Sequence, residues 1–174
     1  MALRQILTEP NKILREKSLI VDKVDEELQK LMSDMLETMY AAPGIGLAAI
    51  QVGVPKRVIV IDISQKDGPR EPMFFVNPEI ISKSDNNSTY EEGCLSVPGQ
   101  FAEIDRPDKC HVKYLDYNGQ AKEIKAEGML ATCIQHEMDH LEGILFIDYL
   151  SRLKKTMIIK KLSKQKKAIE RIVV

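Results

Sequence analysis

The chain has 174 residues, enough for one domain with a sizeable core, and we expect residues 1–174 to form that single domain. Hydrophobic residues make up 44% and charged residues 29%, and the net charge of −1 argues against a surface that coats nucleic acid, so no DNA partner is expected. There is no apolar run that could cross a bilayer and no signal-peptide pattern, which favours a cytoplasmic protein without a membrane partner.

A first helix is predicted to begin after Asp25, a suitable N-cap residue, and to end before Pro43. Its apolar residues follow helical spacing, and we interpret them as core: Leu28, Leu31, Met32, Met35, Leu36 and Met39. The segment Gly44-Ile45-Gly46 follows. Its two glycines permit a close approach of the backbone, but the segment lacks the third glycine of a dinucleotide-binding fingerprint.

Two segments rich in β-branched or aromatic residues predict strands in the middle of the chain. Residues 57–63 form a continuous apolar run that is typical of a buried strand. Residues 73–81 form a second strand that Pro78 interrupts, which predicts a sheet edge or a bulge at that point. The polar residues 82–88 then predict a turn.

A β-hairpin is predicted where residues 109–117 and 120–127 flank the dipeptide Asn118-Gly119. Asn-Gly is a strong signal for a type I′ turn, because that turn needs a positive φ at both central residues. Cys110 on the first of these strands is interpreted as structural.

The next helix, predicted over residues 129–141, carries the most informative motif of the chain. His136 and His140 are four residues apart, so both imidazoles lie on one helix face, where two nitrogens can bind one metal ion. Glu137 lies beside them, where it can take a proton from water. The alternative is a surface helix that carries two of the chain's three histidines by chance. Gly143 is expected to end this helix.

The C-terminal part of the chain is strongly basic. After a short extended segment at 144–149, a final helix is predicted over 151–172. Residues 151–174 contain nine Lys or Arg against one acid, Glu170, which leaves 16 basic and 25 acidic residues in 1–150, a net of −9. A basic helix on an acidic body suggests an anionic partner, although a charge run is commonly just a solvated face.

A catalytic metal site commonly has three protein ligands and one open position, so a third ligand is needed. Cys94 is one of three cysteines, a number that gives no disulfide framework, and the Pro-Gly that follows it predicts an accessible loop. An isolated cysteine is more often a small buried apolar residue, so the residue type alone does not decide the matter.

Three segments together resemble the signature motifs of peptide deformylases. They are Gly44–Gln51, Glu92–Ser96 and Gln135–Gly143, and they match the family pattern in order, in spacing and at every fixed position. The resemblance implies an α+β fold with mixed or antiparallel β-sheets around a central metal-binding helix, an N-terminal helix and a C-terminal helix. It also implies the reaction, removal of the formyl group from newly made polypeptides that begin with formyl-methionine.

The resemblance further implies roles for single residues. Cys94, His136 and His140 hold one divalent metal ion, with Fe²⁺ as the usual ion and Zn²⁺, Ni²⁺ or Co²⁺ as alternatives. Water fills the fourth position, and Glu137 acts as the general base. The side-chain amide of Gln51 and the backbone N–H of Leu95 donate to the formyl oxygen; otherwise Gln51 is a structural amide that caps a turn.

The substrate would lie along the Gly-Ile-Gly segment like an added strand. By family matching, the residues that contact the substrate or form the methionine pocket are Gly44, Ile45, Gly46, Tyr90, Glu92, Gly93, Met129, Thr132 and Cys133. Glu92 is also expected to pair with Arg106 beside the metal. His111 is interpreted as structural, and Phe101 stands where many relatives carry a basic residue.

We also expect the basic helix to dock on ribosomal RNA. Two other functions remain open. A metalloprotease of the His-Glu-x-x-His type would need a third ligand downstream, and only Glu142, Asp148 and Glu170 could supply it. A catalytically silent ribosome-binding protein would not need Glu137 or Gln51. The lack of a transit-peptide pattern favours a bacterial origin.

Overall fold

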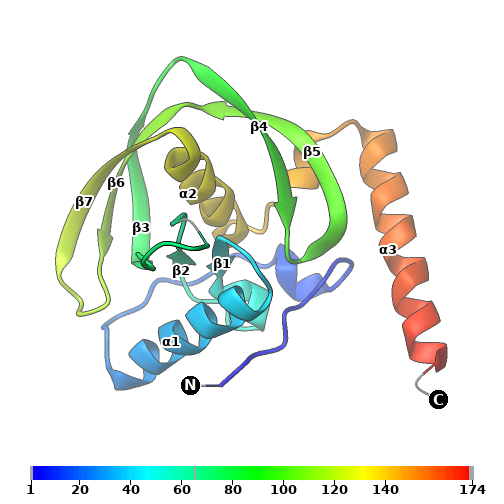
Figure 1. Cartoon of the computed structure of the whole chain (residues 1–174), viewed down its shortest axis with the longest axis horizontal. Coiled ribbons are helices and arrows are strands. Elements are labelled where there is room, and N and C mark those ends of the chain that lie inside the picture. Colours follow the sequence, from blue (N-terminus) through cyan, green and yellow to red (C-terminus); the bar gives the residue numbers. More distant parts are fainter. Residues whose placement is uncertain (1, 65, 173–174) are drawn as a thin grey trace.

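The computed structural model describes residues 2–64 and 66–172. An antiparallel sheet of five strands has the order β1-β2-β3-β6-β7, and strands β4 and β5 form a separate pair. The bounds are β1 Gly46–Ala48, β2 Val58–Ile61, β3 Met73–Lys83, β4 Asn87–Cys94, β5 Val97–Pro107, β6 Lys109–Leu115 and β7 Ala121–Glu127. Helix α2 (Gly128–Leu141) lies in the middle of the molecule with strands around it (Figure 1). The predicted α+β fold is confirmed.

Helix α1 (Glu26–Ala41) begins where the sequence predicted. The Asp25 side chain accepts a hydrogen bond from the Leu28 N–H at 2.9 Å and so satisfies a free donor of the first turn. The methionine and leucine stripe packs into one core cluster with β1 and β2: Leu28, Leu31, Met32, Met35, Met39, Leu47, Val58 and Val60. The stripe is therefore core, as expected, and it packs against β1 and β2.

Strand β3 contains the bulge that Pro78 predicted. The register against β6 shifts between Val76 and Glu79, and Asn77 has a positive φ of 50°. The Asn77 side chain compensates by exchanging two hydrogen bonds with the backbone of Val21. The predicted sheet edge also holds at that end: β2 pairs with β3 over residues 73–76, and beyond Pro78 the described strand β3 pairs with β6 alone.

The predicted hairpin joins β6 and β7, but its turn is not type I′. Only Gly119 of this turn has a positive φ, 79°, and Asn118 does not. The Gly119 N–H donates to the Asp116 carbonyl, and the Asp116 carboxylate accepts from the N–H groups of Asn118 and Gln120. The Asp116 side chain therefore stabilises a longer turn that needs one positive φ instead of two.

Three local predictions before and after α2 are wrong. Residues around Cys94 form a long hairpin of β4 and β5 rather than an open loop, and the expected turn at 82–88 shrinks to residues 84–86. Residues 146–149 form a short 3-10 helix, η3 (Phe146–Tyr149), rather than an extended segment.

The C-terminal helix α3 (Arg152–Ile172) is confirmed, and it extends along one side of the body (Figure 1). Leu162 is buried against β5 and η3, whereas Leu153, Met157 and Ile169 are 61–72% exposed. These three apolar side chains of α3 are therefore uncovered. In the part of the chain that the structure describes, no helix is both long and apolar enough to cross a membrane.

Candidate metal centre

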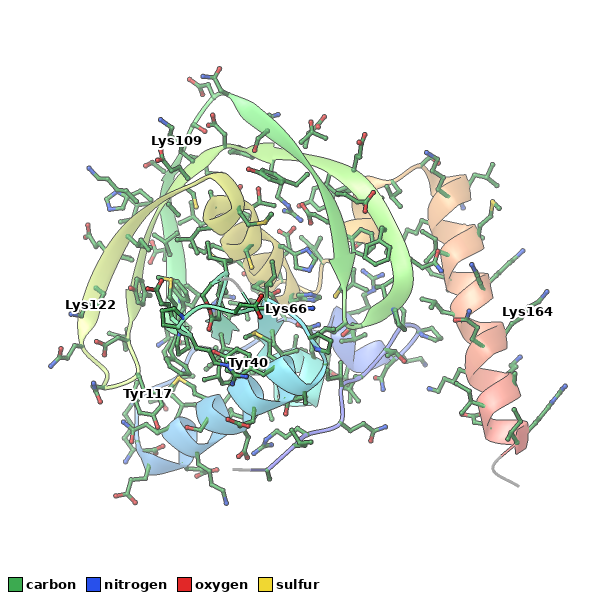
Figure 2. The ribbon with its side chains drawn as sticks, in the orientation of Figure 1. Tyr40, Lys66, Lys109, Tyr117, Lys122 and Lys164 are labelled. Atoms are coloured by element: carbon green, nitrogen blue, oxygen red, sulfur yellow. The ribbon has the colours of Figure 1, made fainter. Side chains whose placement is uncertain are left out.

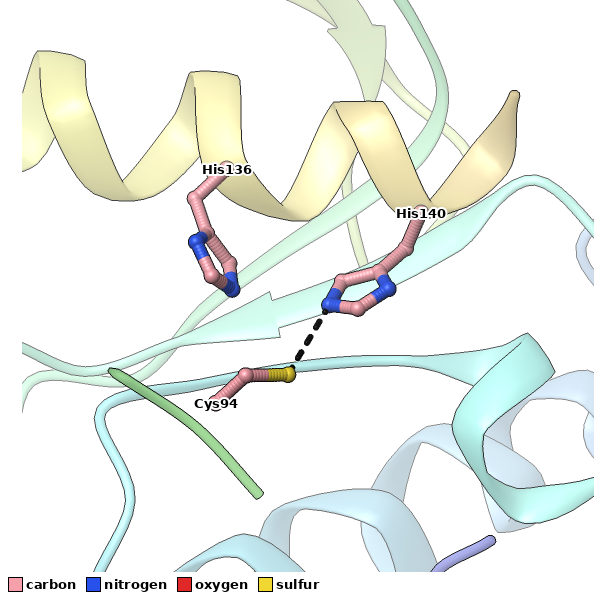
Figure 3. A group of neighbouring side chains, drawn as sticks. All are labelled: Cys94, His136 and His140. Carbon is pink, nitrogen blue, oxygen red and sulfur yellow. Dashed lines mark hydrogen bonds between the residues drawn. The ribbon is translucent and has the colours of Figure 1, made fainter. Parts of the chain in front are cut away.

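Helix α2 places both histidines on one face, and Cys94 at the end of β4 faces them (Figure 3). His136 and His140 are 8% and 1% exposed, and the register of β4 against β5 breaks immediately before Cys94. Cys94 thus meets His136 and His140, which lie 42 and 46 positions later in the sequence, as the motifs predicted.

The donor atoms fit a single ion. One ligand atom from each of Cys94, His136 and His140 lies within 4.8 Å of the other two, and the Cys94 Sγ is 3.4 Å from the His140 Nε2. A tetrahedral ion at ordinary metal–sulfur and metal–nitrogen distances needs a separation of about 3.6 Å between such atoms. Burial lowers the pKa of His140, which favours the neutral imidazole that a metal needs.

Glu92 fixes the orientation of His136. The His136 Nδ1 lies 2.8 Å from the Glu92 carboxylate, which leaves Nε2 free to bind an ion. Arg106 holds Glu92 through two hydrogen bonds of 2.7 and 3.0 Å, so the predicted partner is confirmed. Burial works to raise the pKa of Glu92, but its bonds with His136 and Arg106 lower it below the ordinary value, and the group is an anion.

Glu137 is buried beside the histidines. Burial raises the pKa of its carboxyl to about 7, which is typical of a group that must exchange protons near neutrality. The Oε2 of Glu137 and the Nδ1 of His140 are buried, and neither has a hydrogen-bond partner among the described residues. Buried polar atoms without partners are rare and are expected where water, an ion or a substrate binds.

Gly46 makes room for Glu137. A Cβ atom at position 46 would lie 2.9 Å from the Glu137 Cδ, and one at position 44 would lie 2.8 Å from a methyl group of Leu95. These two glycines therefore allow strand β1 to approach the helix and the Cys94 hairpin closely.

Gln51 bridges two parts of the site. Its Oε1 accepts from the Ala48 N–H at 2.9 Å, which is the turn-capping role considered from the sequence. Its Nε2 lies 3.0 Å from the Ser96 Oγ and 3.5 Å from the Cys94 Sγ. No hydrogen bond from the Leu95 N–H to another described residue is found. The Gln51 amide and the Leu95 N–H are thus two hydrogen-bond donors beside Cys94.

A cleft of about 460 Å³ opens beside these residues. All the residues predicted to contact the substrate line it, as do Gln51, Cys94, Leu95, His136 and Glu137: Gly44, Ile45, Gly46, Tyr90, Glu92, Gly93, Met129, Thr132 and Cys133. Both carboxylate oxygens of Glu92 already have partners, so its position favours the role beside the metal over contact with substrate.

Phe101 also lines the cleft, a placement that the sequence did not predict. It is 65% exposed, and its ring lies against Gly93, where a Cβ would be 2.5 Å from the ring. His111 and Cys110 lie on β6 outside the cleft, and His111 contacts Glu123 at 2.9 Å. The structural interpretation of these two residues agrees with that placement.

The sequence did not single out three residues that support the site. Ser96 accepts from Gln51, and Asp139 bonds both Arg106 and Tyr149. Ser96 and Asp139 are within the matched motifs, so their fixed positions were a signal. Tyr149 gave none, because its contact depends on how η3 folds back.

Two of the three downstream residues that could supply a protease's third ligand are occupied elsewhere. Glu142 pairs with Arg57 at 2.8 Å, and Asp148 pairs with Arg15 at 2.6 Å. Among the described residues, the group that could hold a metal is the Cys-His-His group. The arrangement therefore does not favour a protease of the His-Glu-x-x-His type.

Comparison with known proteins agrees with this geometry. Residues 3–156 match the family described as polypeptide deformylase. A peptide deformylase of Pelagibacter ubique is 68% identical over 95% of this chain and 96% of the relative. One of Maricaulis maris is 60% identical over 98% of each chain. The chain belongs to the peptide deformylase family.

Solved structures support the same conclusion. The crystal structure of a peptide deformylase from Ehrlichia chaffeensis in complex with actinonin has a TM-score of 0.91 and 46% identity, and the match covers 95% of this chain and 98% of that one. The predicted family, fold and enzyme class are confirmed, as is the metal-dependent removal of the formyl group from peptides that defines the family.

Proposed function

We propose that the chain removes the formyl group of N-formyl-methionyl nascent peptides with Cys94, His136 and His140 as the ligands of one divalent ion. The observation that supports this is the meeting of these three donors beside Glu137, with Cys94, His136 and Glu137 lining the cleft. When bound, the ion supplies Lewis-acid chemistry that polarises a carbonyl and acidifies water. Release of formate from a formyl-methionyl tripeptide is the assay for this function.

The ion is proposed to be Fe²⁺, as the family resemblance implies. Two imidazoles and one thiolate also suit Zn²⁺, Co²⁺ and Ni²⁺. The donor set is therefore compatible with all four ions. The activities of the protein with different ions must be compared after loading without oxygen, because a ferrous thiolate site is sensitive to oxygen.

Glu137 acts as the general base and then as the acid. Its Oε2 accepts a proton from the water that attacks the formyl carbon. The same carboxyl then gives that proton to the amine nitrogen as the carbon–nitrogen bond breaks and formate leaves. The unpartnered Oε2 and the raised pKa of Glu137 support this role.

Gln51 and Leu95 donate hydrogen bonds to the formyl oxygen as it gains negative charge. The Gln51 amide N–H₂ has two hydrogens, so one can remain on Ser96 while the other faces the substrate. The backbone N–H of Leu95 needs no rearrangement, because it has no competing partner among the described residues.

Replacing Gln51 tests this role. We expect Gln51→Leu and Gln51→Glu to lower kcat by about 10²- to 10³-fold, because each removes one donor to the developing oxyanion. Gln51→Glu keeps an oxygen that can accept from the Ala48 N–H, so the turn cap survives. Gln120→Leu, at an exposed turn, is the control. Near-normal kcat in Gln51→Glu would assign Gln51 to the turn cap alone.

The substrate backbone is proposed to pair with β1. This strand is the edge of the five-stranded sheet, and Gly44, Ile45 and Gly46 line the cleft. An added strand at a free edge makes backbone hydrogen bonds that are independent of side chains, which permits many sequences after the first residue.

The methionine side chain is proposed to lie against Ile45, Tyr90, Met129, Thr132 and Cys133. Ile45 and Met129 are 46% and 45% exposed, so each presents apolar surface to the cleft. Burial raises the pKa of Cys133, which keeps its thiol neutral and suited to an apolar wall.

The basic helix α3 is proposed to dock on ribosomal RNA near the emerging nascent chain, with the protein acting in the cytoplasm. Its lysines are largely exposed, and Lys164 extends away from the body (Figure 2). The uncovered Leu153, Met157 and Ile169 add apolar surface to the same helix.

Charge removal on α3 tests the docking. We expect Lys→Gln changes at Lys160, Lys161, Lys164 and Lys167 to weaken ribosome binding and to flatten its salt dependence by about 0.7–0.9 in log–log slope per lost phosphate contact. The matched control carries Lys→Gln at four exposed sheet lysines: Lys83, Lys109, Lys122 and Lys125. Equal loss in both variants, or none in the α3 variant, would contradict the docking.

A further inference from the structure

Asp139 is the acidic residue of the metal motif for which the reaction gives no task. It lies on α2 between Glu137 and His140. Its Oδ2 accepts a hydrogen bond from Arg106 at 2.8 Å and another from the Tyr149 hydroxyl at 2.7 Å. The carboxylate is therefore occupied by an arginine and a tyrosine, and it belongs to no group of metal-ligating atoms found in the described chain.

The contacts of Asp139 continue to a metal ligand. The Arg106 guanidinium is 4% exposed, and its other two nitrogens bond the Glu92 carboxylate at 2.7 and 3.0 Å. Glu92 in turn bonds the His136 Nδ1 at 2.8 Å. An unbroken chain of charged and polar groups thus joins Tyr149 on η3 to the imidazole of His136.

Arg106 is the central member of this chain. It lies between two carboxylates, one on β4 and one on α2, and all three of its side-chain nitrogens are used. The planar guanidinium fixes the direction of each bond, so a shift at Asp139 must move the nitrogens that hold Glu92. The position of Glu92 then sets the tilt of the His136 ring.

Helix η3 contacts His136 by a second route. The Phe146 ring, 1% exposed, stacks on the His136 ring with centroids 6.3 Å apart and an interplanar angle of 25°. The Tyr149 ring lies under the Arg106 guanidinium, with the carbon 5.0 Å from the ring centroid. Helix η3 therefore contacts the His136 ring through Phe146, and through Tyr149 it contacts the hydrogen-bond chain that orients His136.

We infer that Asp139 and Tyr149 are positioning residues for the metal ligand His136, and that they set metal affinity through Arg106 and Glu92. The inference rests on the proposed metal centre. Outer partners of metal-bound histidines typically contribute 10- to 100-fold to metal affinity, and an effect transmitted through two further residues is expected at the lower end of that range.

The test measures metal binding rather than turnover alone. The metal-free forms of the parent, Asp139→Asn and Tyr149→Phe compete for Co²⁺ with a coloured chelator, and the visible spectrum of bound Co²⁺ reports the ligand geometry. We expect affinity to fall about 10-fold in Asp139→Asn and about 3-fold in Tyr149→Phe, with altered Co²⁺ spectra. The double variant should fall no further than Asp139→Asn, because Tyr149 acts through Asp139.

Glu142→Gln is the matched control. Glu142 follows the same helix and pairs with Arg57 at 2.8 Å, but neither residue contacts Glu92 or His136. Its Co²⁺ affinity and spectrum should equal those of the parent. Tyr149→Phe removes one oxygen from a half-exposed side chain, so it remains informative if Asp139→Asn folds poorly.

Two results would overturn the inference. Parent-like affinity and spectra in Tyr149→Phe and Asp139→Asn would show that the chain of contacts does not reach the metal. Equal losses in Asp139→Asn and Glu142→Gln would assign the effect to general loosening of α2. A parent that binds no Co²⁺ would instead contradict the metal centre itself, so the two failures are distinguishable.

Discussion

Glu137→Gln is expected to release formate from a formyl-methionyl peptide about 10³-fold more slowly than the parent, with its metal still bound. Glutamine keeps the size of the side chain but cannot take the proton, and general-base catalysis typically contributes 10²- to 10⁴-fold. The ligand atoms come from other residues, so the metal content should stay at the parent level.

The same carboxyl should control the acid limb of the pH–rate profile. Burial raises the pKa of Glu137 to about 7 in the protein alone, and a bound cation works in the opposite direction. With the ion bound, the acid limb should therefore lie below pH 7, and activity should fall there as Glu137 becomes protonated. Glu103→Gln, on an exposed position of β5, is the control and should keep the parent profile. A Glu137→Gln enzyme within 10-fold of the parent would assign the base role to another group.

Cys94→Ala is expected to lose both the metal and the activity. Without the sulfur only two imidazoles remain, and these do not make a closed site with one open position. We expect metal affinity to fall by at least about 100-fold, and formate release to reach background when metal is not in excess. Metal analysis after gel filtration, together with the formate assay, measures both effects.

Cys110→Ala is the matched control for this experiment. Cys110 is a buried cysteine, 3% exposed on β6, and it does not line the cleft. It should keep one ion per chain. If Cys94→Ala also kept its ion and its activity, the third ligand would have to lie downstream of α2, as in a protease of the His-Glu-x-x-His type.

Helical periodicity and motif spacing were sufficient to predict α1, α2 and α3. The stripe from Leu28 to Met39 shows a 3.6-residue period, and the Asp25 cap fixes where α1 begins. The His136–His140 spacing places two nitrogens together in any helix, so this half of the metal site needed no knowledge of the fold.

The hairpin of β4 and β5 could not be read in the same way. Exposed and partly buried residues alternate along β4, but its residues are mostly polar, so no apolar period marks it. Cys94 was therefore assigned to a loop, and only the resemblance to a family identified it as a ligand. Its position against α2 depends on a register break that local sequence does not encode.

Contacts across the fold were the least predictable part. Gly46 is required because the Glu137 carboxylate occupies the space of its missing side chain, 91 positions away in sequence. Asp139 and Tyr149 meet only because η3 folds back under α2. Such requirements follow from packing, whereas turn type, as at Asn118, can change when one side chain such as Asp116 supplies extra hydrogen bonds.

The most direct test compares two products from the parent protein, purified without oxygen and loaded with Fe²⁺. One substrate is a formyl-methionyl tripeptide, and the other is an N-blocked peptide that offers only internal peptide bonds. We predict rapid formate release from the first and no new amino termini from the second. A folded, metal-loaded protein that releases no formate would contradict the deformylase account, and cleavage of the second peptide would instead indicate a protease.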